Sequence, residues 1–479
     1  MRSAPGRADV RAPPHDVPRP GSRTRISASC RPRRPGHPVP SLSGTPAFTT
    51  RTPSAIAGVW ALFLAFAFLM VGNGLQRILL PIRGQAEGIG PGAMGMVMAF
   101  HFGGYLFGAR IITRLLAAVG HIRVFAALAS TASAAVLVNA VLVNSVTWSL
   151  AYFVGGFCNA GVLVVLESWL NDRASNQTRG RILGFYMMVM MGGTAGGQLL
   201  VNVGAPEGFE LFVLSSVLIS LAVIPVTLSA SSAPPVTTAE PMPIRELYRM
   251  VPSAIVGLFF CSFVQSAATS MGAVFGTESG MATSKVATFT AVSVIGAVVL
   301  QIPLGGLSDR YPRRAVIIVV ATISCGLALA GTWIPTSGSL ILLLNFAFGA
   351  FVFPLYGQFV ALANDWVPPE KHMAAASGII MVSSAGAVLS PVVLAFSMET
   401  FGPHAYYGAL AAVLALMVCY LLYRIRVQEA IPVERQSTFQ PILARSGEMA
   451  HSVGRWVRSP LQEWLAHHGR RHVEGGDGP

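Results

Sequence analysis

About twelve apolar runs, separated by short polar stretches, occupy the chain between residues 52 and 426 of its 479 residues. Each run is close to the ~20 residues that an α-helix needs to cross the hydrocarbon core of a bilayer. The pattern therefore predicts an all-α polytopic membrane protein with twelve transmembrane helices. The predicted spans are residues 54–77, 92–116, 123–143, 147–170, 181–203, 209–229, 252–276, 285–307, 314–334, 338–363, 373–397 and 404–425.

The polar stretches between the runs differ in their basic residues. Every second stretch carries arginine or lysine, whereas the others are nearly free of base and include Glu207, Glu210 and Glu399. Because basic loops stay on the cytoplasmic side, both termini are expected in the cytoplasm. Arg83 and Lys285 are the exceptions to this rule. The basic residues of the cytoplasmic set are Arg114, Arg123, Arg173, Arg179, Arg181, Arg245, Arg249, Arg310, Arg313, Arg314 and Lys371.

Composition excludes several other classes of protein. Hydrophobic residues make up 53% of the chain and charged residues only 11%, which is not the composition of a soluble globular protein. The net charge of +13 comes largely from the arginine-rich first fifty or so residues and the cytoplasmic loops, so it does not indicate nucleic-acid binding. The five cysteines are scattered, and the sequence has no metal-ligand cluster, Walker A loop or G-x-S-x-G motif. We therefore predict neither an enzyme nor a metal or cofactor site.

The segment from Gly305 to Arg314 reads Gly-Gly-Leu-Ser-Asp-Arg-Tyr-Pro-Arg-Arg and joins two predicted spans. It predicts a tight glycine-rich cytoplasmic turn in which Asp309 can cap a helix and the arginines can pair with acids or lipid phosphates. An ordinary positive-inside loop would explain the arginines but not the spacing of Gly-Gly and Asp. The segment resembles the G-x-L-x-D-R-x-x-R-R loop signature of the major facilitator superfamily. This resemblance implies a transporter built from two six-helix bundles.

An internal repeat supports the same two-bundle layout. Glycines in the fifth predicted span recur with identical spacing in the eleventh span, which is the parallel repeat expected of this superfamily. Small residues at four-residue spacing also serve simple helix packing. The matched positions are Gly184, Gly192 and Gly196-Gly197 with Gly378, Gly386 and Ser390-Pro391. The expected domains are a basic N-terminal tail (1–52), an N-terminal bundle (53–229), a cytoplasmic linker (230–250), a C-terminal bundle (251–426) and a cytoplasmic tail (427–479).

A second group of motifs in the N-terminal half narrows the resemblance. Together these motifs resemble a bacterial branch of the superfamily that consists chiefly of permeases without an assigned substrate. The first-half copy of the loop signature lacks its acid, and the fifth span has Gly-Gly where drug antiporters have Gly-Pro, so drug antiport is less supported than general permease activity. The motifs are Glu-Ser-Trp-Leu-Asn-Asp (167–172), Arg-Gly-Arg (179–181), Gly184, Tyr186, Gly104-Tyr105, Gly108 and Gly-His-Ile-Arg-Val-Phe (120–125).

Polar side chains within the predicted spans are candidates for the substrate pathway, because the resemblance places the site near mid-membrane between the two halves. The alternative is that Asn and Gln side chains only form hydrogen bonds that hold helices together. Arg77 needs a partner or water, so a cavity-facing role competes with a side chain that reaches outward to the membrane surface. The pathway candidates are Asn73, Gln76, Arg77, Asn159, Gln265 and Gln358.

Two titratable residues are candidates for proton coupling. His101 lies inside the second span and its imidazole titrates near neutrality, although a packed histidine is the simpler interpretation. Glu167 lies near the cytoplasmic end of the fourth span, where it can pair with arginines in an inner gate or accept the coupling proton. The expected cytoplasmic gate consists of Gly305, Asp309, Arg310, Arg313, Arg314 and Asp365, the last as the second-half counterpart of Glu167.

The sequence thus predicts a secondary active transporter of a bacterial cytoplasmic (inner) membrane. It would move a small solute by alternating access, with proton coupling as an option, and its partners would be the solute and the lipid bilayer. The alternative is a non-transporting membrane sensor or scaffold with a transporter-like body. Such a sensor would depend on the C-terminal tail, which reads either as an amphipathic interfacial helix or as a disordered segment.

Overall fold

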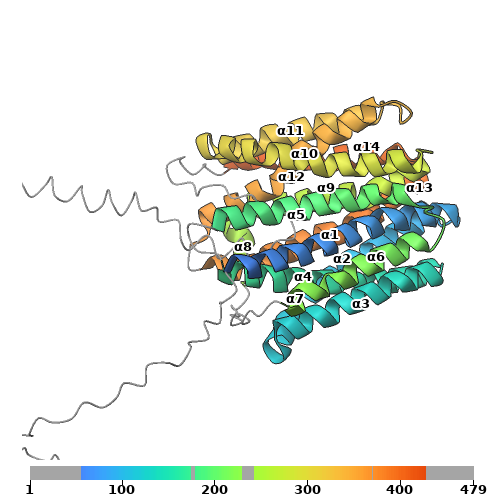
Figure 1. Ribbon diagram of the computed structural model, residues 1–479. Helices are drawn as coiled ribbons and strands as arrows, with labels where there is room; N and C mark the ends of the chain where they lie inside the picture. The colour runs from blue at the N-terminus through green and yellow to red at the C-terminus, as the bar shows by residue number, and fades with distance from the viewer. Residues whose placement is uncertain (1–54, 174–178, 229–241, 369–370, 428–479) are drawn as a thin grey trace, which may run out of the picture. The chain divides into compact units, whose positions relative to one another are not determined.

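A computed structural model of the chain describes residues 55–173, 179–228, 242–368 and 371–427, so both predicted tails lie outside the described residues. These residues belong to one compact unit that begins at Thr52, and their regular secondary structure is helical throughout. In Figure 1 the long helices run side by side. Their bounds are α1 Ala55–Ala86, α2 Pro91–Val119, α3 His121–Val141, α4 Ser145–Arg173, α5 Arg179–Leu199, η1 Leu200–Val203, α6 Glu210–Leu221, α7 Val223–Leu228, α8 Ile244–Met250, α9 Pro252–Glu278, α10 Thr283–Arg310, α11 Arg313–Gly331, α12 Leu340–Trp366, α13 His372–Phe401 and α14 Ala405–Val427.

Each of the twelve predicted spans corresponds to helix in the structure. Eleven helices among the described residues are long and apolar enough to cross a membrane, and α5 is the predicted span that is not one of them. The glycines of α5, together with Gln198 near its end, lower its apolar character. The sixth span is interrupted at Ala222, between α6 and α7. Pro225 explains the interruption, because proline cannot donate to the carbonyl four residues earlier, that of Leu221.

Two elements differ from the predicted pattern. The first helix continues through Pro81 to Ala86 instead of ending at Arg77, because transmembrane helices tolerate proline where neighbouring helices compensate. Arg77 is therefore more than two turns from the end of its helix. The other difference is α8, which forms inside the predicted linker and lies at the end of the bundle where α1 begins (Figure 1).

The same packing scheme occurs in both halves of the bundle. In the first half α2 packs on α4 and α1 on α5, and in the second half α10 packs on α12 and α9 on α13. Glycine permits this close approach. A Cβ added to Gly104 would overlap the backbone carbonyl of Phe153, and one added to Gly296 would overlap that of Phe346. The bundle therefore consists of two pseudo-symmetric halves, as the resemblance to the major facilitator superfamily predicts.

The two halves meet mainly through three helix pairs, α1 with α9, α2 with α13 and α5 with α10. At the end of the bundle where α1 finishes, Gln85 donates a hydrogen bond of 2.7 Å to the backbone carbonyl of Thr277. At the same end, Gly95 of α2 lies so close to α13 that an added Cβ would overlap Ala395. A cavity lies between these helix pairs, deeper in the bundle.

Candidate functional site

A cavity with a volume of about 110 Å³ lies between the two halves. This is far more than the ~15 Å³ that one water molecule requires, so the space admits several waters or a small solute. Gln265, on its wall, is the midpoint of α9, which places the cavity near mid-membrane. The lining residues are Arg77, Phe102, Tyr105, Met190, Met191, Thr194, Ser262, Gln265, Ser266, Thr269, Val294, Phe353, Ser383, Ser384 and Ala387.

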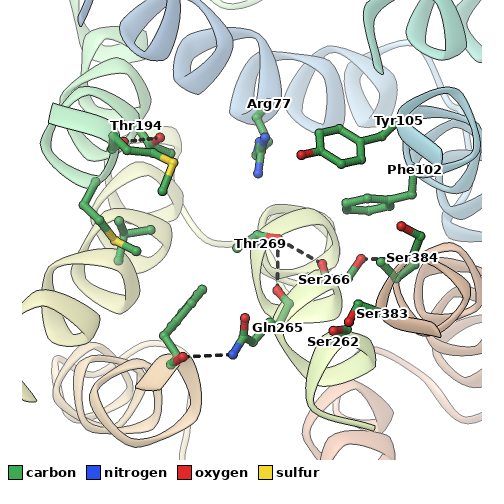
Figure 2. A pocket seen from close by; sticks show the side chains of 15 residues that line it. Arg77, Phe102, Tyr105, Thr194, Ser262, Gln265, Ser266, Thr269, Ser383 and Ser384 are labelled. Atoms are coloured by element: carbon green, nitrogen blue, oxygen red, sulfur yellow. Dashed lines mark hydrogen bonds between the residues drawn. The ribbon is translucent and has the colours of Figure 1, made fainter. Parts of the chain in front are cut away.

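Arg77 is the charged residue of this wall. Figure 2 shows its side chain reaching from α1 into the cavity, opposite residues of α9. Its side chain is partly buried, and none of the carboxylates that the structure describes forms an ion pair with it. Of the two sequence alternatives for Arg77, this geometry matches the cavity-facing one, and the guanidinium places an unneutralised positive charge at the site.

The facing wall consists mainly of hydroxyl groups and one amide. On α9, Ser262, Ser266 and Thr269 follow one another at helical spacing, and Ser383 and Ser384 approach from α13 (Figure 2). Ser262, Ser266 and Thr269 occupy one face of α9, a helix that is buried on nearly all sides. The cavity is thus polarised, with a cation on the α1 side and neutral polar groups on the α9 and α13 side.

Hydrogen bonds hold this neutral wall in a defined arrangement. The Gln265 side-chain amide donates to the backbone carbonyls of Val352 and Phe353 on α12, at 3.1 and 3.0 Å. Ser266 donates to the carbonyl of Ala387 at 2.9 Å. Thr269 donates to the carbonyl of Gln265 at 3.0 Å. Because the donors of these three side chains are committed to backbone groups, their oxygens are the atoms that remain for a solute.

The other predicted pathway residues lie away from this wall. Asn73 of α1 donates to Asn159 of α4 at 3.4 Å, a long hydrogen bond between two helices. Gln76 is buried. Gln358 is fully buried, and neither of its amide atoms has a hydrogen-bond partner within the described ranges. Of the six candidates, the structure brings Arg77 and Gln265 together on one cavity.

His101 borders a second, much smaller cavity that also touches Arg77 and Phe102. Its ring lies 4.5 Å from the ring of Tyr152, centroid to centroid, and the residue is buried. His101 therefore belongs to the surroundings of Arg77, in a small cavity that Ser270 of α9 also lines.

The Glu-Ser-Trp segment of α4 fastens this helix to two neighbours. Glu167 is 1% exposed and accepts a hydrogen bond of 2.8 Å from the hydroxyl of Tyr186 on α5. Ser168 lies 3.3 Å from Nε2 of His121, and the Trp169 ring stacks on the same imidazole at 5.8 Å. Motifs that are far apart in the sequence thus meet in space, at the end of the bundle where α4 finishes.

The predicted gate residues cluster at that same end of the second half. Arg313 is buried and pairs with Asp365 at 2.6 Å, with a second contact to Asp309 at 3.4 Å. The guanidinium of Arg314 lies 5.4 Å from the centre of the Trp366 ring. Arg310 is exposed. This cluster ties the start of α11 to the end of α12.

One expectation about this segment is wrong. The sequence predicts a tight turn over 305–314 after a span that ends at 307, but α10 continues through Arg310, and only Tyr311 and Pro312 separate it from α11. Glycine is tolerated inside a helix, and Asp309 and Arg313 span the two-residue break as an ion pair. Asp309 consequently acts as a partner of Arg313.

Sequence reasoning missed most of the cavity wall. It selected amides for their polarity and passed over the hydroxyl residues, among them Tyr105 and Thr194. The available signal was the spacing of Ser262, Ser266 and Thr269, which places polar groups on one face of an apolar helix. That pattern is more specific than the presence of a single polar residue.

Fold and composition together define a class, that of multi-pass membrane proteins with the major facilitator fold. The family model described as Major Facilitator Superfamily matches residues 254–471. YcaD of Escherichia fergusonii, an uncharacterised MFS-type transporter, is 23% identical over 373 residues, which cover 78% of this chain and 95% of that protein. An MFS-type transporter of Yersinia enterocolitica is 26% identical over 349 residues, which cover 71% and 88% of the two chains.

Solved structures share the fold at lower sequence identity. The nucleoside transporter NupG superposes with a TM-score of 0.63 at 12% identity, over 78% of this chain and 99% of that chain. An inward-facing, unoccupied bacterial homologue of the human lysosomal transporter Spinster gives 0.60 at 15% identity, over 85% and 100%. The similarity to these solved structures shows the major facilitator fold.

Proposed function

We propose that this protein is a secondary active transporter of the major facilitator superfamily that moves a small solute across a bacterial cytoplasmic membrane. The observation that carries the proposal is the mid-membrane cavity, whose wall is shared by both halves of the bundle. A site at the interface of two halves becomes accessible from alternate sides when the halves rock against each other. Arg77 and Gln265 are its central residues.

Side-chain contacts between the halves support such a movement, because those described at the two ends are hydrogen bonds that can break as the halves move. At one end Gln85 bonds to Thr277 across the halves, beside the packing of Gly95 on α13. At the other end Arg110 of α2 donates to the sulfur of Met381 on α13, at 2.9 Å. By the loop charges the first end faces outward and the second faces the cytoplasm. Neither contact is a buried ion pair, and alternating access requires contacts that differ between the two states.

Proton coupling at Glu167 forms a second part of the proposal. A carboxyl group that is 1% exposed within a bundle is costly to keep charged, which suits a site that gains and loses a proton during the cycle. Its partner, the Tyr186 hydroxyl, can donate to the charged form. His101 is the alternative proton site, because it borders the small cavity beside Arg77.

Uptake into proteoliposomes tests the proposal. The purified protein would be reconstituted and supplied with a mixture of known acidic, neutral and basic metabolites, with and without an alkaline lumen. Mass spectrometry of the lumen would report which solutes enter. Empty vesicles and a Ser266→Trp variant, in which the indole would fill the cavity, are the controls. We expect at least one solute to enter only with the unsubstituted protein.

Absence of flux for every solute under every gradient, from correctly folded protein, would favour the sensor or scaffold alternative. Uptake that persists in Ser266→Trp would leave transport intact but remove the cavity from the pathway. Uptake that does not respond to the pH gradient would remove Glu167 and His101 as coupling sites.

A further inference from the structure

The walls of the central cavity identify the chemical class of its solute. Resting on the proposed transport function, we propose that the solute is a small monocarboxylate bearing hydroxyl groups. Its carboxylate binds Arg77, and its hydroxyl groups face the α9 wall. The inference comes from the charge of one wall and the donor–acceptor balance of the other.

The charge of the cavity requires an anion. Arg83 and Arg313 of the described bundle have acidic partners, Glu87 and Asp365. Arg77 has none among the described carboxylates, although it is partly buried and far from both ends of α1. A charge inside a membrane protein needs a countercharge or water. When a solute displaces the water, the solute must supply the negative charge.

The number of cations limits the solute to one negative charge. Arg77 is the single basic residue on the cavity wall as described. A dianion such as a phosphate monoester would retain one uncompensated charge in this low-dielectric site. A carboxylate matches the planar guanidinium, which can donate two parallel hydrogen bonds to it. Phe102 lies beside Arg77 and limits the water that would weaken this pairing.

The opposite wall favours solute groups that donate hydrogen bonds. Gln265 uses its amide hydrogens on α12 carbonyls, while its Oε1 has no partner within the described residues. The hydroxyl hydrogens of Ser266 and Thr269 are directed to backbone carbonyls. The oxygens of these three side chains keep free lone pairs. A carboxylate, which only accepts, fits these three oxygens poorly. A hydroxyl donates to them and can also accept from Ser262, whose hydroxyl has no partner within the described residues.

Glycerate is a suitable probe because it has close analogues that each remove one feature. Glyceramide keeps its shape without the charge, and serine replaces the 2-hydroxyl by an ammonium and has no net charge. Glycerol 3-phosphate carries a second negative charge, and lactate and gluconate bracket glycerate in size. Each would be offered, radiolabelled, to proteoliposomes that contain the unsubstituted protein or a variant.

We expect saturable uptake of at least one of the three monocarboxylates, with no uptake of glyceramide, serine or glycerol 3-phosphate. Arg77→Lys should raise the apparent KM about tenfold or more with little change in maximal rate, since a point charge cannot copy the guanidinium fork. Thr269→Val replaces the threonine by a residue of nearly equal shape and should raise the apparent KM several-fold. Arg83→Lys, which keeps a cation beside Glu87, should leave KM unchanged.

Uptake of glyceramide or serine with the KM of glycerate would overturn the inference, and so would an unchanged KM in Arg77→Gln. Transport of neutral or cationic metabolites alone, with none of the monocarboxylates, would also overturn it while leaving the protein a transporter. If no solute of any class moves, the proposed function itself fails.

Discussion

The side-chain amide of Gln85, near the end of α1, donates a 2.7 Å hydrogen bond to the backbone carbonyl of Thr277, near the end of α9. This bond joins the two halves of the bundle at the end that the loop charges assign to the outside. The cavity between the same two helices lies deeper, around Arg77 and Gln265. The bond therefore closes the outer end above the candidate solute site.

Gly95 is the residue whose enlargement should oppose this closure. A Cβ at Gly95 would overlap Ala395 and lie 2.7 Å from the carbonyl oxygen of Pro391, so Gly95→Ala should force α2 and α13 apart at the outer end. We expect a several-fold lower rate of uptake, because the population shifts to the outward-open state. Gly103→Ala on the same helix is the matched control, since the nearest atom to its Cβ is 3.9 Å away.

Equal uptake rates in Gly95→Ala and Gly103→Ala would show that the contact between α2 and α13 does not limit the cycle. Size-exclusion profiles of both variants would confirm that the comparison concerns folded protein.

The Arg313 cluster should dominate the stability of the cytoplasmic end. Asp365→Asn leaves a buried guanidinium without its closest partner, and breaking a buried pair typically costs about 3–5 kcal/mol. Asp309→Asn should cost less, because Asp309 is 31% exposed and its contact is longer, at 3.4 Å. Thermal unfolding in detergent would rank the variants.

Glu246→Gln is the control for this ranking. Glu246 pairs with Lys371 at 3.0 Å on an exposed surface, where such pairs contribute within about 1 kcal/mol. An Asp365→Asn protein as stable as Glu246→Gln would contradict the assigned role of the cluster. Both Asp365→Asn and Asp309→Asn should also lower the transport rate, since they loosen one gating state.

Much of the fold followed from the sequence because hydrophobic length is a direct physical constraint in a bilayer. The helix ends that were misjudged involve proline and glycine. Pro81 lies inside α1 and Gly305-Gly306 inside α10, whereas Pro225 does interrupt its helix. A proline interrupts a helix or not according to whether neighbouring side chains satisfy the freed carbonyl, and that depends on tertiary packing.

The cavity was only partly predictable, for a reason specific to central helices. α9 and α12 are buried on nearly all sides, so their apolar residues do not reveal which face points to the cavity. Polarity alone makes Gln358 as good a candidate for the substrate pathway as Gln265. Gln358, however, is buried and is not among the residues of the cavity wall. Arg77 was identifiable, because its charge restricts where the side chain can lie.

Glu167 should affect the coupling of transport and not the affinity for the solute. It lies at the end of α4, bonded to Tyr186, and is not among the residues of the cavity wall. Glu167→Gln should abolish accumulation driven by a pH gradient while solute exchange without a gradient continues with an unchanged KM. Tyr186→Phe, which removes only the hydroxyl, should reduce the maximal rate less.

Two assays on the same vesicles would separate these effects. Gradient-driven accumulation that survives in Glu167→Gln would remove it as the proton site and direct attention to His101. Loss of exchange as well as accumulation would indicate a role in the gate.

The orientation of the chain gives a further prediction. Reporter proteins fused at Ser232 and inserted at Thr336 should report opposite sides of the membrane, with Ser232 in the cytoplasm, because arginine is concentrated in alternate loops. Lys285 does not weaken this assignment. Its ammonium donates to the carbonyls of Ser337 and Gly338 at 2.6 and 2.8 Å, so it is committed to the loop that precedes α12. Signals from the same side would contradict the twelve-span topology.

The central claim, that the cavity opens to both sides in turn, is tested most directly by a single cysteine on its wall. Thr269→Cys would be placed in a cysteine-free background and exposed to a membrane-impermeant maleimide from either side of oriented vesicles. We predict labelling from both sides, with Gly95→Ala increasing outside labelling and decreasing inside labelling. Labelling from one side alone, unchanged by Gly95→Ala, would contradict alternating access and leave a sensor with a one-sided pocket.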